Sequence, residues 1–284
     1  MRQICVQPNP KSKLSTGLLV ASVIVGLWLG SLAFLCTNIV QFTPQWILPA
    51  ILGRTFIQTG LFIVAHDAIH GSLIPSDRQL NNRIGQLSVT LYAFLSYQKL
   101  SLNHWQHHRN PGQVSDPDFH DGIHRNVFSW YLKFMQGYLD GRQKIVLLLG
   151  MGTVFHTLQF GFHVSVANLI LFWVLPISLS SMQLFFFGTY LPHRSNVDST
   201  KSGNAENSHR AISSNYPLFW SFLTCYHFGY HWEHHEYPSL PWYHLPAVRQ
   251  PQLPRQPIKT DIGNPLVLRL ATTSPLFTLL LIAC

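Results

Sequence analysis

Two long runs without a charged side chain most strongly limit what this chain can fold into. One covers residues 14–53 and the other residues 145–193. Each run is about twice the roughly 20 residues that an α-helix needs to cross a bilayer. Polar or turn-forming residues interrupt each run near its middle, at 37–44 and at 163–168. We therefore predict two transmembrane hairpins, and so four crossings of the membrane.

Composition also favours a membrane protein. Only 11% of the 284 residues are charged and 47% are hydrophobic, which is a low charge content for a soluble protein. We expect an all-α membrane protein in which two helical hairpins support a cytoplasmic helical cap that carries the histidine motifs. The four transmembrane helices are predicted at residues 17–37, 46–66, 145–162 and 168–190.

The placement of basic residues indicates the orientation. The connectors inside the two hairpins contain no Lys or Arg, whereas the N-terminus and the stretches 78–144 and 194–259 contain nearly all of them. Positive charge marks the cytoplasmic side of membrane proteins. Because topology accounts for the net charge of +8 and no base-reading motif is present, no nucleic-acid partner is expected. Arg54 lies inside the second predicted helix, where we expect it to face a polar cleft or to snorkel.

Shorter segments complete the predicted organisation. The apolar segments 85–97 and 217–229 are too short to cross a membrane, and we expect them to lie in the interface or to pack beneath the cytoplasmic portion. Residues 194–215, rich in Ser, Asn and charge, are interpreted as a loop. One aromatic group in the last predicted helix is compatible with a substrate path or with ordinary packing: Phe185, Phe186, Phe187 and Tyr190.

The histidines form groups with helical spacing. Side chains at i, i+3 and i+4 share one face of a helix, so each group can direct two or three imidazoles at one point. In the predicted topology all three groups lie on the same side of the membrane, together with His193 at the end of the fourth helix. The three groups are His66 and His70, then His104, His107 and His108, and finally His231, His234 and His235.

The first group resembles the HExxH motif of zinc proteases, but that interpretation fails. The motif needs a Glu as general base, and Asp67 stands at that position. A catalytic zinc takes about three protein ligands, far fewer than the nine imidazoles available. Two metal ions fit the supply of ligands better. Imidazole suits Fe, Zn, Cu and Ni, so the spacing alone leaves the metal open.

At this level of detail the chain resembles a known family. The motifs FIVAHDAIHG, HWQHHRNPGQVSDPDFH, FFFGTYLPHR and TCYHFGYHWEHHEYPSLPW resemble those of the membrane-bound di-iron fatty-acid desaturases and hydroxylases, and among them the carotenoid 4-ketolases. The family signature is one HxxxH or HxxxxH box and two HxxHH boxes. The resemblance implies a desaturase-like di-iron membrane domain over residues 1–250, followed by a divergent C-terminal tail at 251–284.

The resemblance also implies an activity. The family members in question are oxygenases that convert the carbon-4 methylene of a β-ionone ring to a ketone by two successive hydroxylations, from β-carotene to echinenone and canthaxanthin. Two iron ions, O2 as co-substrate and electrons from an external donor such as ferredoxin are implied. The chain contains no GxGxxG motif, so we do not expect it to bind a dinucleotide itself.

Individual residues take roles from the matching motifs. Asp67 and Asp118 are assigned a supporting catalytic role, because metal-bound histidines usually donate their second N–H to a carboxylate. For Asp116 and Glu233, that role and an ordinary solvated charge both remain open. His227 is either a further ligand or a pocket residue. The implied iron ligands are His66, His70, His104, His107, His108, His193, His231, His234 and His235.

Other functions remain in competition at this stage. A fatty-acid desaturase or hydroxylase and a carotenoid 3-hydroxylase would carry similar boxes. A membrane metal transporter is the non-enzyme alternative, although it would place ligands at several depths along a span. A haem-binding electron carrier would need only paired axial ligands. The histidines of the polar loops are expected at the surface: His120, His124, His209 and His244.

Overall fold

The fold is known from a computed structural model, and every regular element in the part of the chain that it describes is a helix. Four helical segments are long and apolar enough to cross a membrane, which confirms the predicted all-α membrane fold. The described residues are 16–37, 44–120, 122–123, 125–194 and 209–249. The four segments are Thr16–Cys36, Pro44–His70, Gly141–Gly161 and Val166–His193.

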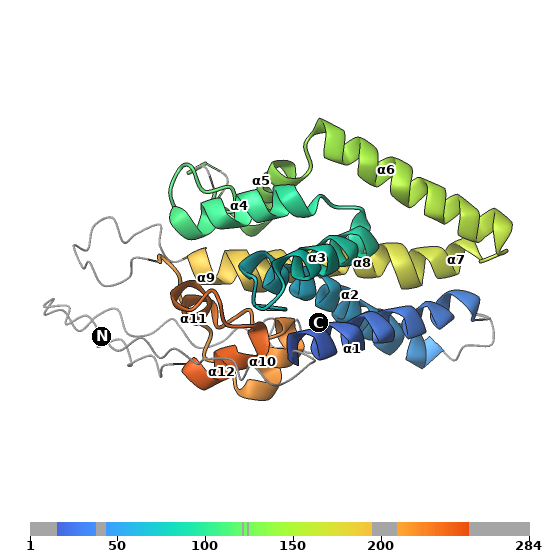
Figure 1. The fold of residues 1–284 in the computed structure, drawn as a ribbon. Helices are drawn as coiled ribbons and strands as arrows, with labels where there is room; N and C mark the ends of the chain where they lie inside the picture. The colour runs from blue at the N-terminus through green and yellow to red at the C-terminus, as the bar shows by residue number, and fades with distance from the viewer. Residues whose placement is uncertain (1–15, 38–43, 121, 124, 195–208, 250–284) are drawn as a thin grey trace, which may run out of the picture. The chain divides into compact units, whose positions relative to one another are not determined.

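The first hairpin contains the central helix of the bundle. Helix α1 (Thr16–Ser31) continues into a 3₁₀ turn, η1 (Leu32–Cys36), and a second turn, η2 (Pro44–Trp46), leads into α2 (Ile47–His70). Helix α2 packs against α1, α3 and α8 (Figure 1). It extends four residues beyond the predicted end at residue 66. Gly71 ends it with a φ of 74°, a left-handed cap that glycine adopts without strain.

The second hairpin is built from helices with π turns. Helix α6 (Gly141–His156) runs into the π turn η3 (Thr157–Gly161). The returning helix is continuous and contains two further π turns, which often mark functional sites. Its parts are α7 (Val166–Leu169), η4 (Ile170–Val174), α8 (Leu175–Phe185), η5 (Phe186–Tyr190) and α9 (Leu191–His193).

The two shorter apolar segments pack, through α3 and α10, against the middle of α2. The carbonyl of Tyr92, near the end of α3 (Arg78–Ala93), accepts a hydrogen bond of 2.8 Å from the Gln58 side chain. After α10 (Leu218–Cys225), the Tyr226 hydroxyl donates to the Phe56 carbonyl at 3.1 Å. Gln58 lies about 18 Å from the His70 end of α2 along the helix axis. Of the two arrangements expected from the sequence, both segments therefore adopt the one in which they pack beneath the cap.

The cap consists of short helices, two of which begin with a side-chain cap. Ser96 accepts a hydrogen bond from the Lys99 amide at the start of α4, and Asn126 accepts one from Ser129 at the start of α5. Such caps satisfy amide groups that a helix N-terminus leaves unpaired. The elements of the cap are α4 (Tyr97–Arg109), α5 (Val127–Tyr138), α11 (His231–Glu236), η8 (Trp242–His244) and α12 (Leu245–Val248).

Arg54 is neither in a polar cleft nor snorkelling, so the prediction for it is wrong. Its side chain is 1% exposed and lies between helices. The guanidinium donates to the Phe172 carbonyl at 2.9 Å and to the Ser31 hydroxyl, and it lies 5.9 Å from the centre of the Trp28 ring. Phe172 belongs to the π turn η4, and an irregular turn at membrane depth needs hydrogen-bond donors from neighbouring helices. The Arg54 guanidinium supplies such a donor to the Phe172 carbonyl.

Replacing Arg54 tests this account. We expect Arg54→Ala to lower the free energy of unfolding by roughly 1–3 kcal/mol, because the Phe172 carbonyl and the Ser31 hydroxyl lose their donor inside the bundle. Thermal unfolding in detergent would measure the change. The control is Arg142→Ala, since Arg142 is exposed in the first turn of α6. An equal midpoint for the two variants would contradict the assigned role.

Candidate metal centre

Local helical geometry brings the predicted histidines together at one end of the bundle. His66 and His70 are one turn apart near the C-terminus of α2, and His104 and His108 are one turn apart on α4. On α11, His231 is followed one turn later by His234 and His235. Because side chains at i, i+3 and i+4 share a face, each helix directs its imidazoles toward the others.

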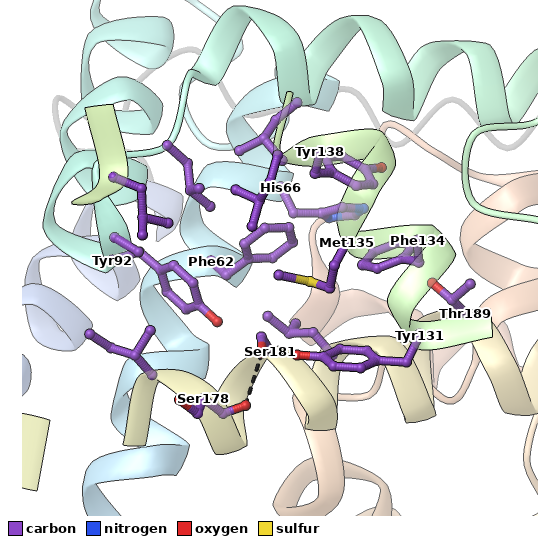
Figure 2. A pocket seen from close by; sticks show the side chains of 18 of the residues that line it. Phe62, His66, Tyr92, Tyr131, Phe134, Met135, Tyr138, Ser178, Ser181 and Thr189 are labelled. Atoms are coloured by element: carbon purple, nitrogen blue, oxygen red, sulfur yellow. Dashed lines mark hydrogen bonds between the residues drawn. The ribbon is translucent and has the colours of Figure 1, made fainter. Parts of the chain in front are cut away.

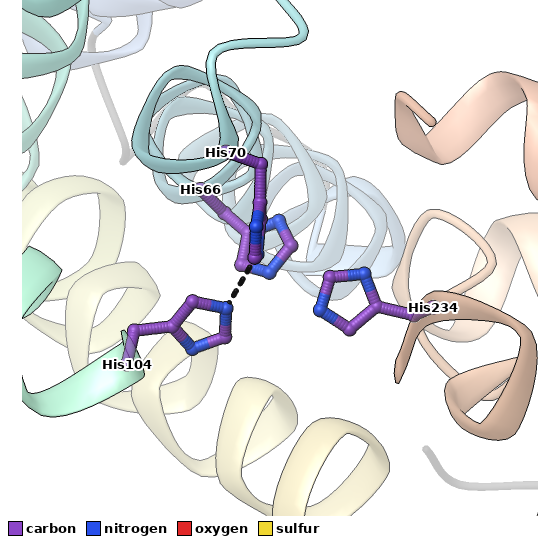
Figure 3. Close-up of side chains that lie close together, drawn as sticks. All are labelled: His66, His70, His104 and His234. Carbon is purple, nitrogen blue, oxygen red and sulfur yellow. Dashed lines mark hydrogen bonds between the residues drawn. The ribbon is translucent and has the colours of Figure 1, made fainter. Parts of the chain in front are cut away.

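Four of the rings form a first cluster. Figure 3 shows them converging from α2, α4 and α11. One nitrogen of each ring lies within 4.8 Å of those of the others. The closest pair is His70 Nε2 and His104 Nε2, at 2.7 Å. The members are His66, His70, His104 and His234.

A second cluster of four buried rings lies beside the first. Its nitrogens also fall within 4.8 Å of one another. The His235 Nε2 atom is 3.1 Å from both His107 Nε2 and His231 Nε2. His193, at the end of the fourth membrane helix, completes it, with its ring centre 4.9 Å from those of His107 and His231. The members are His107, His193, His231 and His235.

His108 connects the two clusters. Its Nε2 atom lies 3.1 Å from His104 Nε2 and 2.9 Å from His234 Nε2, so it points to the centre of the first cluster. Its ring also stacks on His235 of the second cluster, with ring centres 4.3 Å apart. All nine histidines that the sequence singled out as ligands therefore come together, in adjacent groups of five and four.

Hydrogen bonds fix the orientation of two rings in the second cluster. His107 Nδ1 lies 3.0 Å from both carboxylate oxygens of Asp116. His193 Nδ1 lies 2.8 Å from the carbonyl oxygen of Arg210 and donates to it. A ring that donates through Nδ1 keeps the lone pair of Nε2 free for a metal. Both rings are thus held in the tautomer that a ligand needs.

Electrostatics favour neutral imidazoles at most positions. Burial lowers the pKa of five cap histidines, which keeps a nitrogen lone pair available for a metal at neutral pH. Burial also acts to lower the pKa of His107, but the hydrogen bond and the charge of Asp116 outweigh it and leave that pKa raised. A cation at Nε2 would displace that proton. The five are His104, His108, His231, His234 and His235.

The donors fit transition-metal ions. Both nitrogens of His66 and the Nε2 atom of His193 are buried without a hydrogen-bond partner among the described residues, an arrangement that costs free energy unless another group binds them. Metal ions between the rings would satisfy these atoms. A purely nitrogen donor set suits Fe, Zn, Cu or Ni and does not suit Mg²⁺ or Ca²⁺.

The acidic residues take different positions from one another. Asp67 accepts a hydrogen bond from the Trp242 amide at 3.4 Å and lies 3.6 Å from His66 Nδ1. Asp118 accepts a hydrogen bond of 2.6 Å from the Tyr138 hydroxyl, and burial raises the pKa of Asp118 to about 6. Asp116, for which the sequence left the role open, is the carboxylate that holds the His107 ring.

Glu233 supports the backbone around α11. Its carboxylate accepts a hydrogen bond from the Ser213 hydroxyl, and that hydroxyl in turn accepts one from the Trp232 amide. Glu233 is 1% exposed, so it is not the solvated charge that remained possible from the sequence.

His227 lies outside both clusters. The backbone is left-handed at Tyr226 and His227, with φ of 46° and 62°, so α10 ends before His227 and α11 begins only at His231. No single helix face therefore joins His227 to the third box. Its Nδ1 atom lies 3.1 Å from the Ser221 hydroxyl, and its ring stacks on Tyr230.

The expectation that loop histidines lie at the surface is partly wrong. His120 is only 6% exposed, because its loop folds back and places the ring against Phe119 and Trp130. His244 is exposed as expected, and His209 is half-buried beside Glu236. His124 lies outside the described residues.

A cavity of about 550 Å³ leads to the two histidine clusters. Its walls are mostly apolar, and Figure 2 shows His66 and Tyr138 across the cavity from Ser178 and Ser181. Two rings of each cluster reach its inner end: His66, His104, His107 and His231. Chemistry at either cluster is therefore open to a molecule in this cavity.

Sequence reasoning missed the wall that α5 contributes. Tyr131, Phe134 and Tyr138 line the cavity. Their spacing of three and four residues was the available signal, because such residues share a helix face. In the last membrane helix, Phe185 packs against Phe134 and Trp130 instead of lining the cavity, which agrees with ordinary packing.

The Asp116–His107 contact gives a testable prediction. We expect Asp116→Asn to weaken metal binding by about 10–100-fold, because a neutral amide holds the His107 ring less firmly than a carboxylate does. Competition with a chelator, followed by metal analysis of the purified protein, would measure the loss. Glu236→Gln is the control, since Glu236 is exposed and pairs with His209. Equal metal retention in both variants would refute the assignment.

Comparison with known proteins identifies relatives over most of the chain. The β-carotene 4-ketolase 3 of Haematococcus lacustris is 40% identical over 196 residues, which cover 69% of this chain and 59% of the relative. A β-carotene ketolase from a Paracoccus species is 39% identical over 246 residues, covering 84% and 95%. A zeaxanthin 4-ketolase of Chlamydomonas reinhardtii is 36% identical over 230 residues, covering 80% and 50%.

The algal relatives are longer proteins, and this chain spans less than two thirds of their length. A family model described as fatty acid desaturase matches residues 41–261, which is more than half of the chain. The chain belongs to the fatty acid desaturase family.

Proposed function

We propose that the protein is an O2-dependent oxygenase that converts the carbon-4 methylene of a carotenoid β-ionone ring to a ketone. The observation that carries the proposal is an apolar cavity in a membrane protein that ends at histidines of both clusters. Relatives named β-carotene ketolase and zeaxanthin 4-ketolase support the choice of substrate. β-Carotene, yielding echinenone and then canthaxanthin, is the substrate we propose.

Two iron ions are the proposed cofactors. Bound iron would supply the activation of O2 that a C–H bond of a hydrocarbon requires. The first ion would be held by His66, His70, His104, His108 and His234, and the second by His107, His193, His231 and His235. Asp116 would keep the His107 ring in the ligand tautomer.

The protein's own contribution is to position the ring and to exclude water. The cavity walls beside the histidines are apolar, with Phe62, Leu184 and Phe228 among them. A ring held against these side chains presents its methylene groups to the gap between the two clusters. Excluding water from this end prevents side reactions of the reactive intermediates. Asp118, held by Tyr138, is the acidic group that faces the same space.

The reaction balances with an external reductant. Each hydroxylation replaces one C–H hydrogen by a hydroxyl group, consumes one O2, two electrons and two protons, and releases one water. After the second hydroxylation at the same carbon, the gem-diol loses water to give the ketone. We propose that the electrons come from a donor protein such as ferredoxin. The basic residues near the cap support placing this side of the protein in the cytoplasm.

Expression in a host that accumulates β-carotene tests the proposal. We expect a carbon-4 ketone, identified by chromatography and mass, and its loss in His234→Ala, because the first cluster loses one of its ligands. His244→Ala is the matched control, since His244 is exposed and lies outside both clusters. A carbon-3 alcohol would indicate a carotenoid 3-hydroxylase, and an altered fatty acid with unchanged pigment would indicate a lipid desaturase.

The extent of the functional domain is a separate proposal. We propose that residues 1–250 form the catalytic domain and that the tail 251–284, which lies outside the described residues, is not needed for it. A chain that ends at Gln250 is expected to keep its ketone yield per amount of protein. Quantification of pigment against immunoblot signal would measure this. Loss of activity with normal accumulation would assign the tail to the catalytic machinery.

A further inference from the structure

The cavity also reaches the outside of the bundle, at a place far from the histidines. Nearly all of its lining residues are buried or half-buried. Three described lining residues are exposed: Leu148 on α6, Val174 at the end of η4 and Ser178 on α8. Leu148 is 68% exposed and Val174 36%. These three residues, which we call the membrane opening, therefore border both the cavity and the surroundings of the protein.

The membrane opening lies within the transmembrane segments. Leu148 belongs to the segment Gly141–Gly161, and Val174 and Ser178 belong to Val166–His193. Ser178 precedes His193 of the second cluster by 15 residues, which corresponds to about 22 Å along a helix. Lipid, and not water, surrounds apolar spans of this kind. An apolar molecule dissolved in the bilayer meets the opening directly.

Other sides of the cavity are closed by contacts between helices. The Tyr131 hydroxyl and the Ser181 hydroxyl are 2.7 Å apart and tie α5 to α8. On the side of α3, the Tyr92 hydroxyl donates to Ser180 at 3.1 Å. No such contact joins α6 to α8 among the described residues that line the opening. The pair α6 and α8 is therefore the side at which a long molecule can pass.

Gly152 leaves space beside the opening. It lies one helical turn after Leu148, on the same face of α6, and it lines the cavity. A Cβ atom placed on Gly152 would meet no atom within 4 Å. The glycine thus leaves unfilled a volume that a larger side chain at this position would occupy. The Cβ of a substituted residue there would narrow the passage without pushing on neighbouring residues.

We propose that the carotenoid enters sideways from the bilayer between α6 and α8, and that Gly152 keeps this entrance wide enough for a ring. This inference rests on the proposed function for the identity of the substrate. One ring passes the membrane opening and travels along the cavity to the histidines. The polyene chain then occupies the passage, and the far end of the molecule remains in the lipid.

Substitutions at both edges of the opening test the inference. We expect Gly152→Leu to lower the rate of ketone formation by about tenfold or more, since added methylene groups in an apolar pocket discriminate at this level. Gly152→Ala should have a smaller effect. Ser178→Leu, on the opposite edge, should reproduce the loss, because its larger side chain would narrow the same opening. The change removes no contact between helices, since among the described residues the Ser178 hydroxyl bonds only to Val174 of its own helix. Iron content should stay at the parental value in all three variants.

Gly26→Leu is the matched control. Gly26 also lies in a membrane helix, α1, with no atom within 4 Å of an added Cβ, but it does not line the cavity. Gly152→Leu and Gly26→Leu both replace glycine by a better helix former. A loss of activity in Gly152→Leu that is absent in Gly26→Leu therefore reports the passage and not folding. Parental rates in both Gly152→Leu and Ser178→Leu would overturn the inference. A parental enzyme that makes no ketone would instead overturn the proposed function.

Discussion

The rest of the structure depends on the removal of nine imidazole rings, six buried and three half-buried, from water at one end of an apolar helical bundle. Polar groups removed from water need partners, and neighbouring rings cannot satisfy one another at every nitrogen, as the unpaired atoms of His66 and His193 show. Metal ions between the rings would supply the missing partners. Because α2, α4, α9 and α11 each contribute histidines to the clusters, the same ions would hold together four segments that lie far apart in the sequence.

Several local features serve this convergence. The left-handed Gly71 ends α2 directly after His70, and the left-handed pair Tyr226 and His227 separates α10 from α11. The carboxylate of Asp116 and the carbonyl of Arg210 each fix one ring. Below the cap, Arg54 supports the π turn η4. That turn carries the side chains that begin the cavity wall.

Much of this arrangement could be predicted from the sequence. Uncharged runs of fixed length determine the membrane helices, and helical spacing groups the histidines, so four helices and nine converging rings followed from local patterns. Roles that depend on loop geometry could not be predicted. Asp116 and Asp118 are only two positions apart in the sequence. The fold alone shows that Asp116 holds His107 while Asp118 faces the cavity. His227 has helical spacing to His231, but left-handed backbone removes it from the site.

Rings of both clusters line the inner end of the cavity, which would make it a blind passage for the proposed substrate. A carotenoid such as β-carotene has a ring at each end, and a blind passage holds only one of them next to the ions. To be modified at both ends, the molecule has to withdraw into the lipid, turn around and thread its other terminus. Under the proposed function, the singly oxidised pigment would then be a free species in the bilayer, and competition between fresh and half-processed molecules would set the ratio of the two products.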